Sequence, residues 1–421
     1  MTAITAKDQA AGIRRSRPPL VTYPLLLRFA TQLGSSASFY LLLSVVPLYA
    51  RAAAGGSAPG LATGALMVTT VAGELVTPRL TAACGYRLTL AAGLILLGAP
   101  SLALALAGPA RLDLIMAVCV FRGLGFGITV VAGGSLTAAL IPAERRGEGL
   151  ALSGLVSGVP ALTALPLGVW LAGRIGYPLV FIVAAVAALA ALAAVPGLPG
   201  RLPHGRPGAG PAGHEPPAPA GHQPAGPPAS APPLGVLTAL RTPALLRPGL
   251  MFAVTTTAAG IVVTFLPIAD HQATGELTAL ALFAQTASAT LSRCVSGWYS
   301  DRHGPGRLII PALATAASGM LMLTATGLPA AVLAGCVLFG AGFGVAQNAT
   351  LSLMYARVRA SGYAAVSAVW NIAYDAGMGL GAAAFGLLAG GTGYSAAFAI
   401  TSAAMLAALA PALRDRGLAA S

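Results

Sequence analysis

Long apolar stretches recur along almost the whole chain, and they restrict the fold more than any other feature of the sequence. Of the 421 residues, 56% are hydrophobic and only 8% are charged, whereas charged residues make up about 25% of an ordinary soluble protein. An apolar run of about 20 residues is long enough to cross a bilayer as a helix. The composition therefore predicts an all-α integral membrane protein and argues against a large soluble enzyme or barrel.

Twelve apolar ranges have the length and composition of membrane-spanning helices. These ranges are 24–48, 60–78, 87–107, 113–140, 149–171, 177–196, 245–269, 277–298, 307–327, 330–354, 363–389 and 393–412. Several contain Gly or Pro, which membrane helices tolerate better than helices in water do. We therefore expect twelve spans, numbered in chain order.

The distribution of Arg and Lys among the connecting segments predicts the orientation in the membrane. With a cytoplasmic N-terminus, the inner segments carry 18 of these residues, and the outer loops carry only Arg51, Arg111 and Arg174. Cytoplasmic segments hold the excess of basic residues in membrane proteins. We expect a multi-pass protein of the cell membrane with both termini in the cytoplasm. Three further arginines lie within apolar runs: Arg28, Arg122 and Arg293.

The net charge of +13 does not predict nucleic-acid binding, because no block of Lys and Arg exceeds two consecutive residues. The four cysteines show neither metal-ligand spacing nor a disulfide framework. We expect no metal and no cofactor. The expected partners are a small-molecule substrate, protons and the lipid bilayer, and the expected oligomeric state is a monomer.

A segment rich in Pro, Gly and Ala, residues 197–233, divides the chain into two halves. Such a composition cannot bury a core and predicts a disordered linker. The expected organisation is a cytoplasmic tail (1–20), a six-helix bundle (21–196), a cytoplasmic linker (197–236), a second six-helix bundle (237–414) and a short tail (415–421).

The two halves resemble each other in sequence. "LLR" at 26–28 matches "LLR" at 245–247, and "GLGFG" at 123–127 matches "GAGFG" at 340–344. The offset between matched residues stays between 217 and 220 throughout. A near-constant offset predicts two parallel, pseudo-symmetric six-helix repeats.

The charged stretch "GWYSDRHGPGR", residues 297–307, falls between spans 8 and 9 on the cytoplasmic side. Its residues Gly297, Asp301, Arg302, Gly304 and Arg307 resemble the G-x-x-x-D-R-x-G-x-R signature of the major facilitator superfamily, with one extra residue before the last arginine. The resemblance implies a twelve-helix transporter in which this stretch forms a tight turn and a cytoplasmic gate. A charged loop that only fixes topology is the alternative.

The equivalent stretch of the first half keeps the glycine and the last arginine as Gly85 and Arg87. It has Ala82 and Ala83 in place of the Asp-Arg pair. This departure from the family pattern implies a gate whose charged contacts come mainly from the second half.

Span 4 carries Arg122 about ten residues from either end, in "VFRGLGFG". A lone arginine at that depth costs about 3 kcal/mol or more, so it should face a partner or a wet cavity. The stretch resembles the buried-arginine signature of proton-coupled family members. The alternative is that Arg122 stabilises the bundle by binding carbonyl groups.

Span 5 contains Gly154, Gly158 and Pro160, which resemble the G-x-x-x-G-P signature of drug/proton antiporters, although Val159 separates the last two. Small residues at this spacing let helices approach closely, and proline bends a helix. The resemblance implies export rather than import.

Two acidic residues lie within spans. Asp375 is near the middle of span 11, and an ionised carboxylate there needs a partner, whereas the protonated form is cheaper in a dry site. We expect Asp375 to carry the coupled proton and to face Arg122 across the cavity. Glu74 of span 2 is the second candidate, although it is also explained as an interfacial acid beside Arg79. The repeat offset pairs Glu74 with Arg293.

In the family, spans 1, 4, 7 and 10 face the centre, which implies a weakly polar and aromatic cavity, with span 11 adding to it. The expected lining residues are Gln32, Ser36, Phe39, Tyr40, Thr256, Gln347, Asn348, Trp370, Asn371 and Tyr374. Such a lining suits an amphipathic organic molecule better than a multiply charged metabolite.

The function implied is proton-coupled efflux of small hydrophobic or amphipathic compounds of the drug or natural-product kind. Transport of a neutral polar metabolite such as a sugar is the first alternative, and a non-transporting sensor or scaffold is the second. An enzyme is not expected, because no span contains His and no Ser/His/Asp or metal constellation forms.

Overall fold

The computed structural model describes residues 21–108, 110–142, 146–201, 236–269, 275–358, 363–407 and 409. The N-terminal half contains α1 (Tyr23–Leu43), α2 (Val45–Ala54), α3 (Ala58–Leu106), α4 (Leu112–Leu140), α5 (Arg146–Ile175), α6 (Tyr177–Ala190) and the 3-10 helix η2 (Ala191–Gly197). The C-terminal half contains α7 (Val236–Arg241), α8 (Pro243–Ala269), α9 (Gly275–His303), the 3-10 turn η3 (Pro305–Arg307), α10 (Ile309–Met322), α11 (Pro329–Ala356), α12 (Tyr363–Thr392) and α13 (Tyr394–Ala407). Both predicted tails (1–20 and 415–421) and most of the predicted linker (197–236) lie outside the described residues.

The prediction of an all-helical membrane protein is confirmed. The described residues contain no strand, and eight of their helical segments are long and apolar enough to cross a membrane. Spans 2 and 3 share one of these segments, because α3 runs through both with 49 residues. α10 and α13 have 14 residues each, which is shorter than predicted. Beyond α10 the chain continues to Leu328 in hydrogen-bonded turns.

The repeat seen in the sequence is also present in the backbone. Gly85 interrupts α3 with φ 79°, and its partner at the repeat offset, Gly304, follows α9 with φ 82°. Gly176 and Gly393, at φ 81° and 78°, form the equivalent turns before α6 and α13. Only glycine adopts such angles without strain. The two halves therefore turn at the same places for the same physical reason.

The glycine motifs GLGFG (123–127) and GAGFG (340–344) pack the two halves in the same way. Gly85 divides α3 into a first arm, before it, and a second arm, after it. In α4 the outer glycines of the motif face the first arm of α3, and the middle glycine faces the second arm. In α11 the outer glycines face α9, and the middle glycine faces α10. A methyl group at any of these positions would meet backbone atoms of the neighbouring helix. The motifs are therefore close-packing sites, as small residues are in membrane bundles generally.

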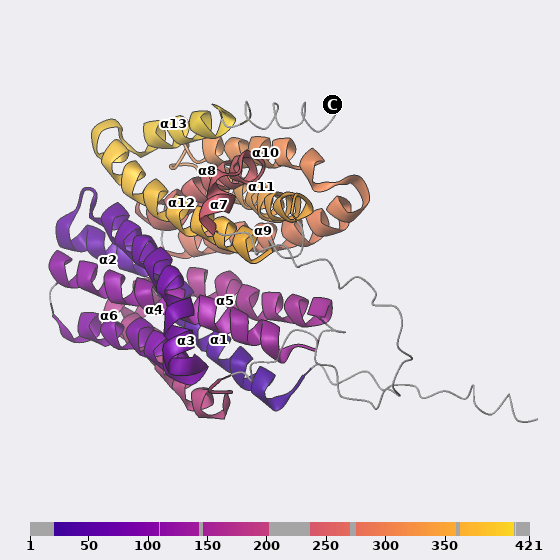
Figure 1. Ribbon diagram of the computed structural model, residues 1–421. Coiled ribbons are helices and arrows are strands. Elements are labelled where there is room, and N and C mark those ends of the chain that lie inside the picture. The colour runs from indigo at the N-terminus through magenta and orange to yellow at the C-terminus, as the bar shows by residue number, and fades with distance from the viewer. Residues whose placement is uncertain are drawn as a thin grey trace, which may run out of the picture.

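The two halves form separate bundles that lie against each other (Figure 1). We call the end where α2 meets α3 and α12 meets α13 the distal end, and the opposite end, where η2 ends and α7 begins, the linker end. Hydrogen bonds join the bundles near the distal end. The hydroxyl of Ser44 donates to the carbonyl oxygen of Val263 at 2.8 Å, and the hydroxyls of Thr63 and Thr264 lie 3.0 Å apart.

The first arm of α3 packs antiparallel against α12, and we call this contact the α3–α12 seam. Gly60 lies against the backbone of Ala382, and Gly379 lies against Met67 one step further from the distal end. At the distal end itself, Arg174 of α5 forms an ion pair with Glu276 of α9. Both of these side chains are more than half exposed, so the pair contributes at most about 1 kcal/mol. The close seam is therefore the main contact that holds the distal ends together.

Candidate functional site

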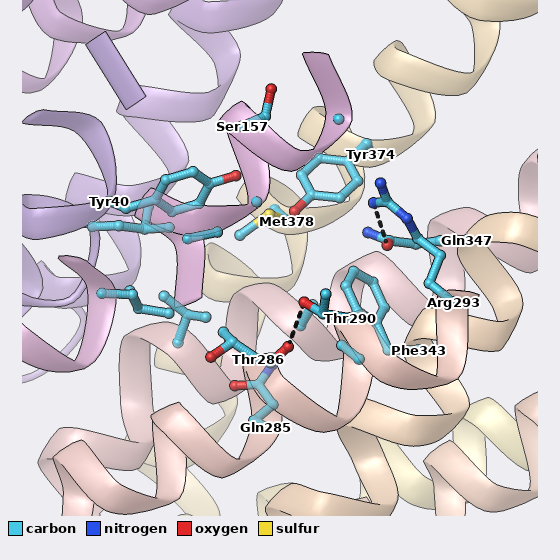
Figure 2. Close-up of a pocket in the computed structure, with 18 residues that line it drawn as sticks. Tyr40, Ser157, Gln285, Thr286, Thr290, Arg293, Phe343, Gln347, Tyr374 and Met378 are labelled. Atoms are coloured by element: carbon cyan, nitrogen blue, oxygen red, sulfur yellow. Dashed lines mark hydrogen bonds between the residues drawn. The ribbon is translucent and has the colours of Figure 1, made fainter. Parts of the chain in front are cut away.

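Two connected chambers lie between the bundles, and the bundles' distal contacts close one end of them. The carboxyl chamber, of about 390 Å³, is lined by α1, α3, α4, α5, α9, α11 and α12 and contains both Glu74 and Asp375. The glutamine chamber, of about 250 Å³, lies deeper toward the distal end and contains Gln285 (Figure 2). The chambers share Tyr40, Ser157, Arg293, Gln347 and Tyr374. They therefore adjoin each other at the interface of the two bundles.

Most of the residues expected to line a cavity are found there. The structure places these expected residues in the wall of the carboxyl chamber: Gln32, Ser36, Tyr40, Gln347, Trp370, Asn371 and Tyr374. They come from both bundles, because spans 1, 10 and 11 all border the interface. The cavity also has walls on α3, α5 and α9, which are spans 2, 5 and 8. The expectation from the family's central helices did not include these spans.

Three expected lining residues lie elsewhere. The ring of Phe39 stacks on Phe126 and borders a small separate pocket beside Arg122. The hydroxyl of Thr256 donates to the carbonyl oxygen of Ala373 at 2.9 Å and so links α8 to α12. The amide of Asn348 faces α9, 3.5 Å from the hydroxyl of Ser300. The sequence places these residues within apolar runs but does not show the direction in which they point.

Packing and hydrogen bonds orient the polar residues of the cavity wall. The Gln32 amide donates to the backbone oxygen of Ser153 at 3.1 Å and also contacts the Ser157 hydroxyl, so it joins α1 to α5. Trp370 stacks on Phe252 with the ring centroids 4.4 Å apart. Its indole N–H points to the Thr350 hydroxyl at 3.4 Å. These side chains are therefore held in place before a ligand binds.

Glu74 and Asp375 meet at the cavity end of the α3–α12 seam. Their carboxyl groups, one from each bundle, line the same chamber and lie close enough to interact electrostatically. The residues are only 9% and 7% exposed. Two carboxyl groups this close cannot both ionise without strong repulsion, so a proton between them is required for the contact. Asp375 is thus one half of a carboxyl pair with Glu74, and the sequence alone could not show this pairing.

Arg122 does not face Asp375 in this structure. Its guanidinium donates to the backbone oxygens of Leu97 at 2.6 Å and Ser38 at 2.9 Å, and to the Ser101 hydroxyl at 2.5 Å. All these partners belong to the N-terminal bundle, and Arg122 does not line either chamber. The geometry is that of the alternative in which Arg122 binds carbonyl groups and ties α4 to α1 and α3. A role for Arg122 in proton coupling stays a prediction.

Two other arginines line the carboxyl chamber, and the sequence gave no role to either. Arg28 of α1 is 4% exposed and donates from Nε to the backbone oxygen of Gly133 at 2.8 Å. Arg293 of α9 borders both chambers, and its guanidinium lies 3.3 Å from Oε1 of Gln347. In the sequence, only their position within apolar runs indicated a special role for these two arginines, as it did for Arg122.

Gly154 and Gly158 of α5 line the glutamine chamber. A methyl group added to either would meet nothing within 4 Å, so these residues do not bring two helices together in this conformation. The close approach expected from their spacing is absent here, because α5 and α9 stand apart at this level and enclose the cavity. Pro160 lies inside α5, which continues past it to Ile175.

Gln285 borders the deep end of the glutamine chamber from α9. It is 3% exposed, and its Oε1 has no hydrogen-bond partner within the described residues. A buried acceptor without a donor costs about 1–3 kcal/mol. This conformation therefore leaves one polar group of the cavity wall unsatisfied.

The predicted gate motif lies at the linker end of α9. Gly297, Asp301 and Arg302 all belong to the helix, so the turn begins only at Gly304, with φ 82°. The Arg302 guanidinium lies 3.8 Å from the ring centroid of Trp298. Arg307 is in η3, and the side chain of Asp301 lies outside the described residues. The expected tight turn is thus confined to the second half of the motif, and its gating role stays a prediction.

Known proteins resemble this chain both in family sequence pattern and in fold. The sequence model of the Major Facilitator Superfamily matches residues 28–382 and 249–419. No curated protein sequence matches the chain. Among solved structures, a bacterial homolog of the human lysosomal transporter Spinster, in an inward-facing and unoccupied conformation, aligns with a TM-score of 0.70 at 15% identity over 94% of this chain and 96% of that one.

Two further solved transporters share the fold. A variant of the peptide transporter POT in complex with sulfate aligns with a TM-score of 0.73 at 15% identity over 98% of both chains. A variant of the nucleoside transporter NupG aligns with a TM-score of 0.66 at 14% identity over 91% of this chain and 98% of that one. At such identities the likeness concerns the fold alone. The family match over most of the chain, together with this fold, shows that the chain is a multi-pass membrane protein of the Major Facilitator Superfamily of transporters.

Proposed function

We propose that this transporter couples the movement of protons to the export of amphipathic organic compounds by alternating access. The observation that carries the proposal is the contact between Glu74 and Asp375, which belong to different bundles and meet at the edge of the cavity. A titratable contact between the two moving parts of a transporter links protonation to conformation. The aromatic and aliphatic residues of the wall support a substrate that is largely apolar.

The structure represents the state in which the distal ends are in contact and the cavity lies toward the linker end. With the linker in the cytoplasm, as the distribution of arginines predicts, this is the inward-facing state. Substrate would therefore enter the cavity from the cytoplasm. Export requires the α3–α12 seam to open and the linker ends to close.

The carboxyl pair makes the seam sensitive to protons. With one shared proton, a hydrogen bond joins α3 to α12 and favours the inward-facing state. Loss of that proton leaves two like charges, which repel by about 4 kcal/mol at 4 Å and an effective dielectric constant of about 20. Such a cost shifts a two-state equilibrium by roughly a thousandfold toward the open seam. A proton taken up outside would thus return the protein to the inward-facing state, and its release inside would allow the next export step.

Other charged and titratable groups face the pair and set its response. Tyr40 of α1 and Tyr374 of α12 both interact electrostatically with Asp375. Arg28 and Arg293 line the same chamber from α1 and α9. A net positive surrounding stabilises the ionised carboxylates, whereas burial opposes their ionisation. Movement of the bundles changes both the burial of the carboxyl groups and their distance from the arginines. Such a change is required for a proton to be loaded on one side of the membrane and released on the other.

Two experiments test the proposal in sequence. Cells that lack their own exporters are screened for compound susceptibility with and without the protein, and a compound whose toxicity falls identifies a substrate. The protein is then reconstituted in vesicles with an imposed pH gradient, and substrate and internal pH are followed together. Asp375→Asn and Glu74→Gln should abolish accumulation driven by the gradient while leaving exchange of substrate measurable.

The test has a matched control variant, and three results would contradict the proposal. Asp113→Asn removes an exposed carboxylate that pairs with Arg111 far from the cavity, and it should transport like the native protein. Native coupling in both carboxyl variants would show that the pair is structural. Uptake driven by a gradient that is acidic outside would show import, and loss of all response to substrate would favour a non-transporting sensor.

A further inference from the structure

The cavity carries an unbalanced positive charge. Among the described residues, two basic and two acidic side chains line the carboxyl chamber: Arg28, Arg293, Glu74 and Asp375. Repulsion between the two neighbouring carboxyl groups favours the state in which they share one proton, and in that state they contribute one negative charge. The two arginines remain charged at all relevant pH values. At least one positive charge is therefore left without a counter-charge in the cavity wall.

Arg293 is the residue at which this charge is available to a ligand. It borders both chambers, and among the described residues no carboxylate forms an ion pair with it. Within the described part of the chain its guanidinium donates only to the neutral amide of Gln347, over a long distance of 3.3 Å. Arg28, in contrast, is buried and bound to the backbone of its own bundle. In the glutamine chamber Arg293 is the only charged lining residue of the described chain.

Two phenol groups share the chambers with Arg293. Tyr40 and Tyr374, one from each bundle, line both chambers that Arg293 borders. Figure 2 shows the two tyrosines and Arg293 around the same chamber, with Gln347 held beside the guanidinium. A guanidinium with phenol and amide groups near it offers the charge and the donors that a carboxylate or similar anion needs. The rest of the chamber is apolar, with Phe343, Leu165 and other aliphatic residues in its wall.

We propose that the substrate is an amphipathic organic anion, whose negative group binds Arg293 between Tyr40 and Tyr374 and whose apolar body occupies the glutamine chamber. This inference rests on the proposed transport function and names the substrate class for it. A cationic compound would be repelled by Arg293, and a neutral one would leave its charge uncompensated. A single negative charge balances the site, whereas a multiply charged metabolite has no further unpaired cation in the described wall to bind.

Binding of an anion also fits the movement that export requires. Arg28 and Arg293 reach the carboxyl chamber from opposite bundles, so closing this chamber brings two positive charges toward each other. Like charges that approach in a site of low dielectric constant repel strongly. An anion between them removes that repulsion and permits the linker ends to close. The proton on the carboxyl pair and the anion at Arg293 would thus favour opposite states, which is the requirement for exchange.

The test measures binding to the full-length protein in detergent at equilibrium, with no gradient, so that its outcome does not depend on transport. Three probes share one apolar body and differ in charge: 2-naphthoate, the neutral 2-naphthamide and the cationic 2-naphthylmethylammonium. Affinity is measured by calorimetry and by the ligand-dependent rise in unfolding temperature. The native protein should bind the carboxylate about 10- to 100-fold more tightly than the amide, as expected for a charged hydrogen bond, and the cation most weakly.

Three variants assign the selectivity to its residue. Arg293→Gln should lose the preference for the carboxylate and keep its affinity for the amide, and Arg293→Lys should retain part of the preference. Arg111→Gln, on the exposed outer surface, should behave as the native protein. If the glutamine variant does not fold, the lysine variant still decides the question, because a point charge without the planar fork must weaken the preference.

Equal or weaker binding of the carboxylate relative to the amide, including the absence of binding by both, would overturn the inference. So would a preference that is unchanged in both Arg293 variants. Anion selectivity without gradient-driven transport would leave this site standing and remove the proposed coupling. Gradient-driven transport of a neutral or cationic compound would do the reverse.

Discussion

Replacement of Gly60 by alanine should shift the protein toward the distal-open state without unfolding it. A Cβ at this position would lie against the carbonyl oxygen of Ala382, with the Ala382 carbonyl carbon at 3.0 Å and the Ala383 Cα at 3.2 Å. These are backbone atoms of α12 that cannot rotate away. Overpacking of this kind costs about 1–3 kcal/mol. If the seam opens during transport, that cost is paid only in the distal-closed state, and the equilibrium shifts by roughly 5- to 150-fold.

The shift can be measured as a distance between the two bundles. Spin labels on Leu106→Cys and Leu387→Cys, two exposed positions of α3 and α12 in a variant without the four native cysteines, report the distal separation by pulsed electron resonance. Gly60→Ala should increase the population with the longer distance. Gly173→Ala is the matched control, because a Cβ there meets nothing within 4 Å. A full loss of 1–3 kcal/mol in unfolding free energy with an unchanged distance distribution would mean that the seam is a fixed joint.

Three further predictions concern other parts of the chain. Gly158→Leu should fold with native stability, because the position is open in this conformation. It should reduce the transport rate at least tenfold, because the larger side chain blocks the approach of α5 to α9. A native transport rate would show that α5 does not close the cavity. Arg122→Met should destabilise the N-terminal bundle by about 3 kcal/mol, because it leaves buried oxygens without donors, and thermal unfolding that matches the native protein would contradict this packing role. A cysteine at Ser230 should react with an impermeant label only from the cytoplasmic side, and labelling of intact cells would reverse the proposed orientation.

The placement of the apolar helices along the chain followed from the sequence because the bilayer fixes the length of an apolar helix. Each of the twelve predicted ranges overlaps a helix, and the repeat offset paired Gly85 with Gly304, whose backbones are alike. The end of α9 was less accurate. A charged Asp-Arg pair suggested a turn, but charged residues at the end of a membrane helix can remain helical. Only the glycine that follows them requires a break.

The site was harder to predict than the fold, because apolar length gives a residue's depth but not the side of the helix on which it lies. Arg122 and Asp375 both lie well inside a span, yet Arg122 faces its own bundle and Asp375 faces the other one. The partner of Asp375 proved to be Glu74, since α3 and α12 pack antiparallel across the interface. Arg293 was visible as a charge within an apolar run. Its importance depends on which carboxylates are absent around it, which only the packed structure shows.

The central claim is that a proton shared by Glu74 and Asp375 controls contact between the bundles. Its most direct test is the distal distance between labels at Leu106→Cys and Leu387→Cys as the pH is raised from about 5 to about 9. The account predicts that the longer distance becomes populated at high pH in the otherwise native protein. It predicts no such response when Glu74→Gln and Asp375→Asn are combined. An identical pH response in the combined variant, or none in the native pair, would contradict the claim.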